Sequence, residues 1–88
     1  MIEVAKQNGE TYAVTVAGRR TTRHRVRLTS DYYHKLTEGK VSPEELIEAS
    51  FTFLLERESN TSILTEFDLP VIATYFPEYE AEIKKRLG

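Results

Sequence analysis

The chain has 88 residues, of which 40% are hydrophobic and 30% charged, and its formal net charge at pH 7 is −2. A chain of this length forms one domain, so we treat residues 1–88 as a single unit. It contains no cysteine, which excludes disulfide bonds, thiolate metal sites and cysteine nucleophiles. There is no long apolar run and no signal-peptide pattern, so we expect a cytoplasmic protein that does not contact membranes.

The charges are divided unevenly between the two halves of the chain. Residues 1–42 contain eight Lys and Arg against four Asp and Glu, which gives +4, whereas residues 43–88 contain four against ten, which gives −6. This asymmetry indicates either that the basic half meets an anionic partner or that the two halves attract each other within one fold. We favour the second interpretation.

Three stretches in the first third of the chain alternate apolar and polar residues with the period of a half-buried strand. They span residues 1–6, 11–17 and 23–29. Between the first two stands Asn8-Gly9, a strong signal for a tight hairpin turn because both residues tolerate positive φ. The sequence therefore predicts an antiparallel meander of three strands, whose apolar face requires a covering layer of helices.

The stretch at residues 41–58 predicts the central helix. Ser42 is a typical N-cap and is followed by a proline at the first helical position. Glu45 stands three residues after the cap and can complete a capping box. The apolar face that includes Phe51 is wide enough to be contacted from two sides.

Shorter helices are predicted on either side of this central helix. One spans residues 30–38 and ends at Gly39. After the central helix, residues 62–67 are expected to form one helical turn, Asp68 to cap another short helix, and Pro77 to begin the last helix. The predicted fold class is therefore α+β: a three-stranded antiparallel β-meander, followed by three to four α-helices packed on one face of the sheet.

No group of residues resembles a catalytic or metal centre. His24 lies on the apolar face of its predicted strand, where a hydrogen-bonded histidine is far commoner than a ligand or a base, and His34 lies on a helix surface. Motifs for zinc proteases, phosphate-binding loops and serine hydrolases are absent. We therefore predict no enzymatic activity, no cofactor and no metal.

The third predicted strand carries a row of arginines. Arg23, Arg25 and Arg27 follow the period of two, so their guanidinium groups share the face opposite the apolar one. In a meander this strand is an edge, where charged side chains prevent aggregation. The alternative is a nucleic-acid or anion-binding face, which Arg19, Arg20 and Lys6 would extend. We favour the first interpretation, in which the acidic helices can also neutralise the row.

About residues 23–58 the chain resembles the ribbon-helix-helix DNA-binding family, in the run RHRVRLTSDYYHKLTEGKVSPEELIEASFTFLLE. An alternating strand leads into a first helix, and a Gly-x-x-Ser turn leads into a second. The resemblance implies that Arg23, Arg25 and Arg27 would face a DNA groove and that the helix after Ser42 would bind a phosphate. The chain departs from that family in the preceding hairpin, the short first helix and the acidic residues that follow Ser42.

Taken whole, the chain is similar to small bacterial proteins that share the pattern SPEEL…SF.FLLERE…YFPEYE, a resemblance that implies no activity. We predict a small non-catalytic structural or protein-interaction module, whose partner is another protein or a second copy of itself. The alternative is a ribbon-helix-helix-like DNA-binding regulator of antitoxin type. In that case Arg23, Arg25 and Arg27 would contact DNA, and the acidic half would contact a partner.

Overall fold

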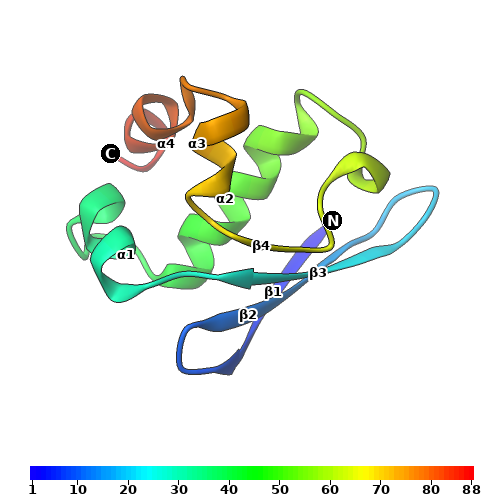
Figure 1. The fold of residues 1–88 in the computed structure, drawn as a ribbon, viewed down its shortest axis with the longest axis horizontal. Helices are drawn as coiled ribbons and strands as arrows, with labels where there is room; N and C mark the ends of the chain where they lie inside the picture. Colours follow the sequence, from blue (N-terminus) through cyan, green and yellow to red (C-terminus); the bar gives the residue numbers. More distant parts are fainter.

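The computed structural model describes residues 1–88 and has an α+β fold (Figure 1). Four strands form one sheet in the order β1-β2-β3-β4. The strands are β1 (Ile2–Asn8), β2 (Thr11–Val16), β3 (Thr22–Arg27) and β4 (Glu66–Asp68). The first three strands are antiparallel, as predicted, whereas β4 runs parallel to β3. The sheet is therefore mixed and has one strand more than the sequence indicated.

The fourth strand corrects two predictions. Residues 62–67 do not form a helical turn, because a short 3-10 helix ends at Ser62 and the chain then extends into β4. Arg25 N donates to Thr65 O at 2.7 Å and Leu69 N donates to Arg27 O at 2.9 Å. These bonds fix the segment along the outer side of β3, so the arginine strand is not an edge of the sheet.

The helices follow the predicted order, with four α-helices in all. They are α1 (Ser30–Thr37), α2 (Pro43–Leu55), α3 (Val71–Tyr75) and α4 (Tyr79–Leu87). The predicted capping box of α2 is confirmed: Glu45 N donates to Ser42 Oγ at 3.1 Å, and Ser42 N donates to Glu45 Oε1 at 3.3 Å. The central helix therefore begins where its cap residues indicate.

Two local predictions are wrong. Asp68 does not cap α3, because it lies in β4 and the residue that precedes the helix is Pro70. The first hairpin forms, but Asn8 pairs with Thr11 and its turn residues are Gly9 and Glu10, none with positive φ. Among all residues positive φ occurs only at Glu38 and Gly39, where α1 ends as predicted.

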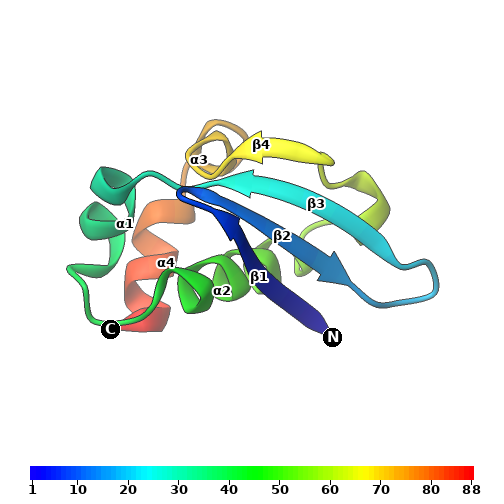
Figure 2. The same cartoon turned by 90° about the horizontal axis from the view of Figure 1, so that it is seen from below.

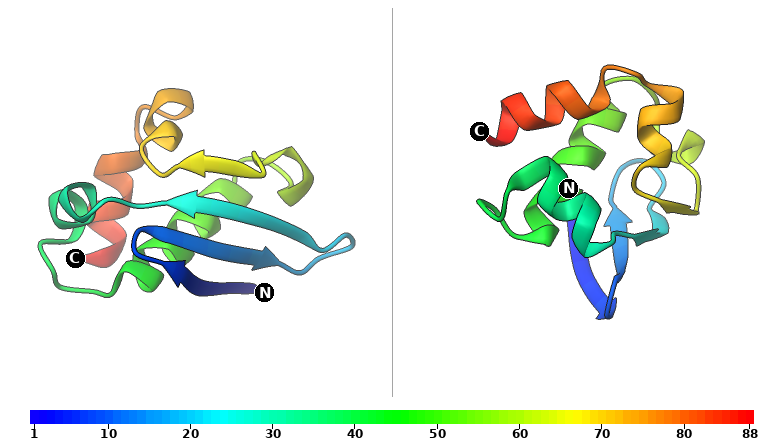
Figure 3. Two further views of the ribbon diagram at one scale, coloured as in Figure 1. Left: turned by 60° about the horizontal axis from the view of Figure 1, so that its bottom comes forward. Right: turned by 60° about the vertical axis from the view of Figure 1, so that its left-hand side comes forward.

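The core lies between the sheet and α2, and α4 packs against the other side of α2. Figure 2 and the left panel of Figure 3 show α2 crossing behind the sheet, while the opposite face of the sheet carries no helix. Phe51 at the centre of α2 is fully buried, as predicted for a helix contacted from two sides. Ser50 on α2 and Tyr79 on α4 share a buried hydrogen bond of 2.6 Å between their hydroxyl groups, which joins these helices.

Candidate functional site

The arginines of β3 point from the uncovered face of the sheet. Arg23, Arg25 and Arg27 are all exposed there, as the period of two predicts. Strand register gives them small or acidic cross-strand neighbours. The rows across the sheet are Glu3–Thr15–Arg23, Ala5–Ala13–Arg25–Glu66 and Thr11–Arg27–Asp68. Acidic residues of the outer strands and the hairpin turn therefore share a surface with the arginine row.

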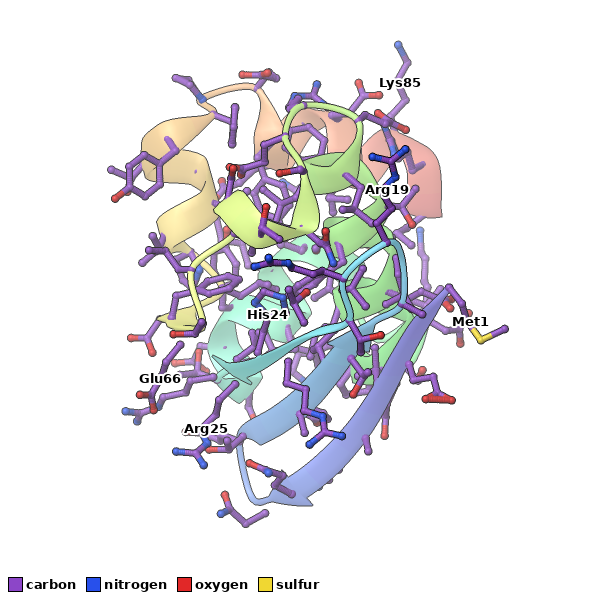
Figure 4. The ribbon with its side chains drawn as sticks, turned by 90° about the vertical axis from the view of Figure 1, so that its right-hand side faces the viewer. Met1, Arg19, His24, Arg25, Glu66 and Lys85 are labelled. Carbon is purple, nitrogen blue, oxygen red and sulfur yellow. The ribbon has the colours of Figure 1, made fainter.

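Two of the three arginines form ion pairs. Arg25 Nη1 lies 3.5 Å from Glu66 Oε2, and Arg27 Nη2 lies 3.5 Å from Glu10 Oε1. Figure 4 shows Arg25 beside Glu66 at the edge where β4 meets β3. All four side chains are largely exposed, so each pair stabilises the fold by well under about 1 kcal/mol. The pairs do, however, reduce the positive charge that the row presents to a ligand.

The remaining arginines of the predicted site have no carboxylate partner. Arg19 and Arg20 lie in the loop between β2 and β3, Arg23 follows at the start of β3, and none of the three forms an ion pair. Asn60 Nδ2 donates to Arg20 O at 2.7 Å, which ties this loop to the 3-10 helix. In Figure 4 Arg19 lies well away from Arg25. The predicted site is therefore divided into two arginines with carboxylate partners, Arg25 and Arg27, and three without, which lie in the loop and at the start of β3.

The strand-helix-helix order of the ribbon-helix-helix family is present as β3, α1 and α2. In that family the strand pairs with the same strand of a second copy, which requires a free edge. Here β3 is hydrogen-bonded to β2 on one side and to β4 on the other. The N-terminus of α2 is occupied by its own capping box and is followed by two glutamates, Glu44 and Glu45, which would repel a phosphate.

Sequence reasoning missed an apolar cavity at the β4 edge. Its volume is about 260 Å³, and it opens between β4, α3 and the C-terminal end of α2. Eight of its ten lining residues are hydrophobic. The lining residues are Leu54, Glu58, Ser62, Ile63, Leu64, Phe67, Val71, Ile72, Tyr75 and Phe76. We call this cavity the apolar groove.

Two exposed side chains border the groove. Leu64 is 47% exposed and Tyr75 is 66% exposed, and Met1 is the only other large hydrophobic residue exposed in the chain. Leu64 lies in the segment that the sequence assigned to a helical turn, and Tyr75 lies at the end of the short helix that Asp68 was expected to cap. The signal for an exposed apolar surface was therefore present, but residue spacing alone does not separate a buried apolar side chain from an exposed one.

His24 supports one wall of this groove through a hydrogen bond to Leu64. Its Nδ1 lies 2.7 Å from Leu64 O and its Nε2 lies 2.9 Å from Thr22 Oγ1. Because a carbonyl oxygen can only accept, Nδ1 carries the hydrogen and donates it to Leu64. The ring is buried against Phe51, with centroids 5.3 Å apart. The prediction that His24 is a hydrogen-bonded histidine on the apolar face of its strand is confirmed, and the ring has two hydrogen-bond partners.

Apart from the pKa of Tyr12 on β2, which burial raises, the shifted pKa values of the molecule lie at helix contacts, away from the arginines and the groove. Burial and the hydrogen bond to Glu80 raise the pKa of the Tyr32 hydroxyl, and the same bond, of 2.7 Å, lowers the pKa of Glu80. Hydrogen bonding from Arg86 lowers the pKa of Glu56, which joins α4 to α2. These groups hold helices together, and none of them lines the apolar groove.

No group of three or more His, Asp or Glu side chains is placed to hold a metal ion, and none of the helices is long and apolar enough to span a membrane. No protein-family model, curated protein or solved structure matches the chain. The resemblances to ribbon-helix-helix proteins and to small bacterial proteins therefore stay predictions.

Proposed function

We propose that the protein is a non-catalytic protein-interaction module that binds a short segment of a partner protein in the apolar groove. One observation carries the proposal: Leu64 and Tyr75, two of the three exposed large hydrophobic residues, border the same cavity of about 260 Å³. Contiguous exposed apolar surface beside a cavity is typical of a binding site for apolar side chains. The occupant is a segment with one or two large apolar residues.

The charges around the groove define the rest of that segment. Glu58 lines the groove and Asp68 lies on the adjoining strand, and neither forms an ion pair within the chain. Glu66 and Asp68 project from the face of β4 opposite Phe67, so these two carboxylates lie beside the groove and do not line it. Glu66 is shared with Arg25. Lys or Arg residues on either side of the apolar anchors would therefore complement the rim and raise the association rate.

The outer edge of β4 offers backbone groups to the same segment. Thr65 O and Leu69 N bond to β3, and in a parallel ladder alternate residues bond to the same neighbour. The backbone groups of Glu66 and Asp68 therefore point away from β3. A partner segment can add to this edge as a short strand while its apolar side chains enter the groove.

Selection of binders from a random peptide library tests the proposal. The wild type is expected to select peptides with apolar residues flanked by Lys or Arg. Binding of these peptides should shift the amide resonances of β4 and α3 in the protein. The double variant Leu64→Ser, Tyr75→Ser replaces the two exposed apolar side chains at the groove and should weaken binding by about tenfold or more. Arg23→Ala on the uncovered sheet face is the matched control and should bind as the wild type does. Peptides that bind both variants equally, or that shift resonances elsewhere, would refute the groove as the site.

A second candidate function, binding of nucleic acid, is favoured by one observation, the absence of carboxylate partners at Arg19, Arg20 and Arg23. A mobility-shift titration at low ionic strength with random-sequence duplex DNA separates the two candidates. Phosphate contacts give affinity that falls steeply with added salt. Salt-sensitive binding that disappears when these three arginines are replaced by Ala would favour the second candidate. We expect neither the wild type nor this triple variant to bind the DNA.

A further inference from the structure

The two edges of the sheet differ in length. β4 presents three residues at one edge, whereas β1 presents seven at the other. Natural sheets shield a long edge with proline, a bulge, or a covering loop or helix. β1 contains no proline, its one register shift lies near its end between Lys6 and Asn8, and within the chain only β2 pairs with it. In the left panel of Figure 3, β1 forms the lower margin of the sheet, and no strand lies beyond it.

Hydrogen bonds at the start of β1 show which of its backbone groups lack a partner. Ala17 N donates to Met1 O at 2.9 Å and Met1 N donates to Ala17 O at 3.4 Å, so these residues form a hydrogen-bonded pair. In an antiparallel ladder such pairs alternate with pairs whose backbone groups point away from each other. The N–H and C=O groups of Ile2, Val4 and Lys6 therefore point outward from the sheet.

We propose that this edge binds a second copy of the chain, with the two β1 strands antiparallel about a two-fold axis at Val4. That register sets Val4 opposite its equivalent and Ile2 opposite Lys6, so all the outward backbone groups of these three residues gain partners. An axis at Glu3 would oppose two carboxylates and leave Lys6 unpaired. An axis at Ala5 would leave Ile2 unpaired.

Apolar side chains beneath this edge are incompletely covered in the single chain. Met1 is 85% exposed, and Ile2 and Val4 are only half-buried. A hollow of about 480 Å³ where β1 meets α2 is lined by Met1, Ile2, Ala49 and Leu55, among others. The two-fold arrangement packs Val4 against its equivalent and extends the covered apolar layer across the junction of the two sheets.

Charge complementarity favours the same register. Lys6 and Glu48 are exposed, and neither forms an ion pair within the chain. Glu48 lines the hollow beside Ile2. The axis at Val4 places Lys6 of the second copy opposite Ile2 and on the same face of the sheet. Its hydrocarbon part covers Ile2 while its ammonium group approaches Glu48, and the symmetry repeats the pair.

Sedimentation velocity over a range of protein concentrations tests the charge contact. The wild type is expected to be a dimer in equilibrium with the monomer. Lys6→Glu and Glu48→Lys each convert two attractions into two repulsions and should weaken the dimer by about tenfold. The double variant that exchanges both charges should recover most of the wild-type affinity. Both side chains are exposed, so neither change is expected to affect folding.

Amide hydrogen exchange tests the backbone pairing. The amides of Ile2, Val4 and Lys6 should become protected as the protein concentration rises, whereas those of Glu3 and Ala5 should be protected at every concentration. Val4→Pro removes one outward N–H and no bond to β2, a position at which an edge strand tolerates proline, and it should yield a folded monomer. Circular dichroism checks that this variant keeps its fold.

A wild type that is monomeric at every concentration would overturn the proposal. So would a dimer that is unaffected both by Val4→Pro and by the single charge reversals, because its contact would lie elsewhere. The β1 edge and the apolar groove lie at opposite edges of the sheet. Dimer formation does not depend on peptide binding in the groove. The groove variant Leu64→Ser, Tyr75→Ser should therefore dimerise normally, and failure of either proposal leaves the other standing.

Discussion

Every second residue of β2 and β3 faces α2, and the residues between them face solvent. Val14 and Val26 on the covered face are fully buried, whereas Arg25 and Arg27 on the other face lie in exposed ion pairs. Because the strands are shared, both faces have the same backbone hydrogen bonds and the same register. The two faces therefore differ only in their side chains, and we expect apolar burial on the covered face to supply most of the stability while the charged face contributes little.

The largest loss of stability is expected from a substitution in α2, the helix that packs on the covered face. Phe51 is fully buried, contacts His24 on β3 and lies 6.0 Å from Phe67 of β4 between ring centroids. Phe51→Ala should lower the free energy of unfolding by about 3–5 kcal/mol, because the cavity cannot fully collapse. Denaturant titration measures this loss, and a change below about 1 kcal/mol would show that the covered face is not the main source of stability.

A pair of isosteric substitutions on adjacent residues of β2 compares the faces directly. Val14→Thr places a hydroxyl group in the fully buried layer and should cost about 1–3 kcal/mol. Thr15→Val makes the reverse change on the uncovered face and should alter stability by less than about 0.5 kcal/mol. Thermal and denaturant unfolding of the two variants give the difference. Equal losses would mean that burial does not distinguish the two faces in stability.

The smallest effect is expected at the ion pairs. Arg25→Ala and Arg27→Ala should each change the free energy of unfolding by less than about 0.5 kcal/mol, because all the side chains concerned are largely exposed. The wild type should also lose little stability in high salt, which screens exposed charges. A loss above about 1 kcal/mol for either variant would show that the charged face also stabilises the sheet.

Local patterns in the sequence were sufficient for much of the fold. The period of two assigned His24 and the arginines of β3 to opposite faces, and the cap residues Ser42 and Glu45 placed the start of α2. Both signals depend on residues close together in the chain, so no distant contact is needed to interpret them. The sequence likewise indicated the α+β class, the first three strands and the order of the helices.

Only the tertiary structure decided which strands are edges. The apolar spacing of Ile63, Leu64 and Phe67 fits a helical turn as well as a short strand, and backbone pairing with β3, about forty residues earlier, selects the strand. That one pairing moves the arginine strand into the interior of the sheet, gives Arg25 its carboxylate partner and opens the apolar groove beside β4. It also leaves β1 as the only long free edge of the sheet. Such outcomes depend on contacts between residues distant in sequence, and the spacing of neighbouring residues carries no information about them.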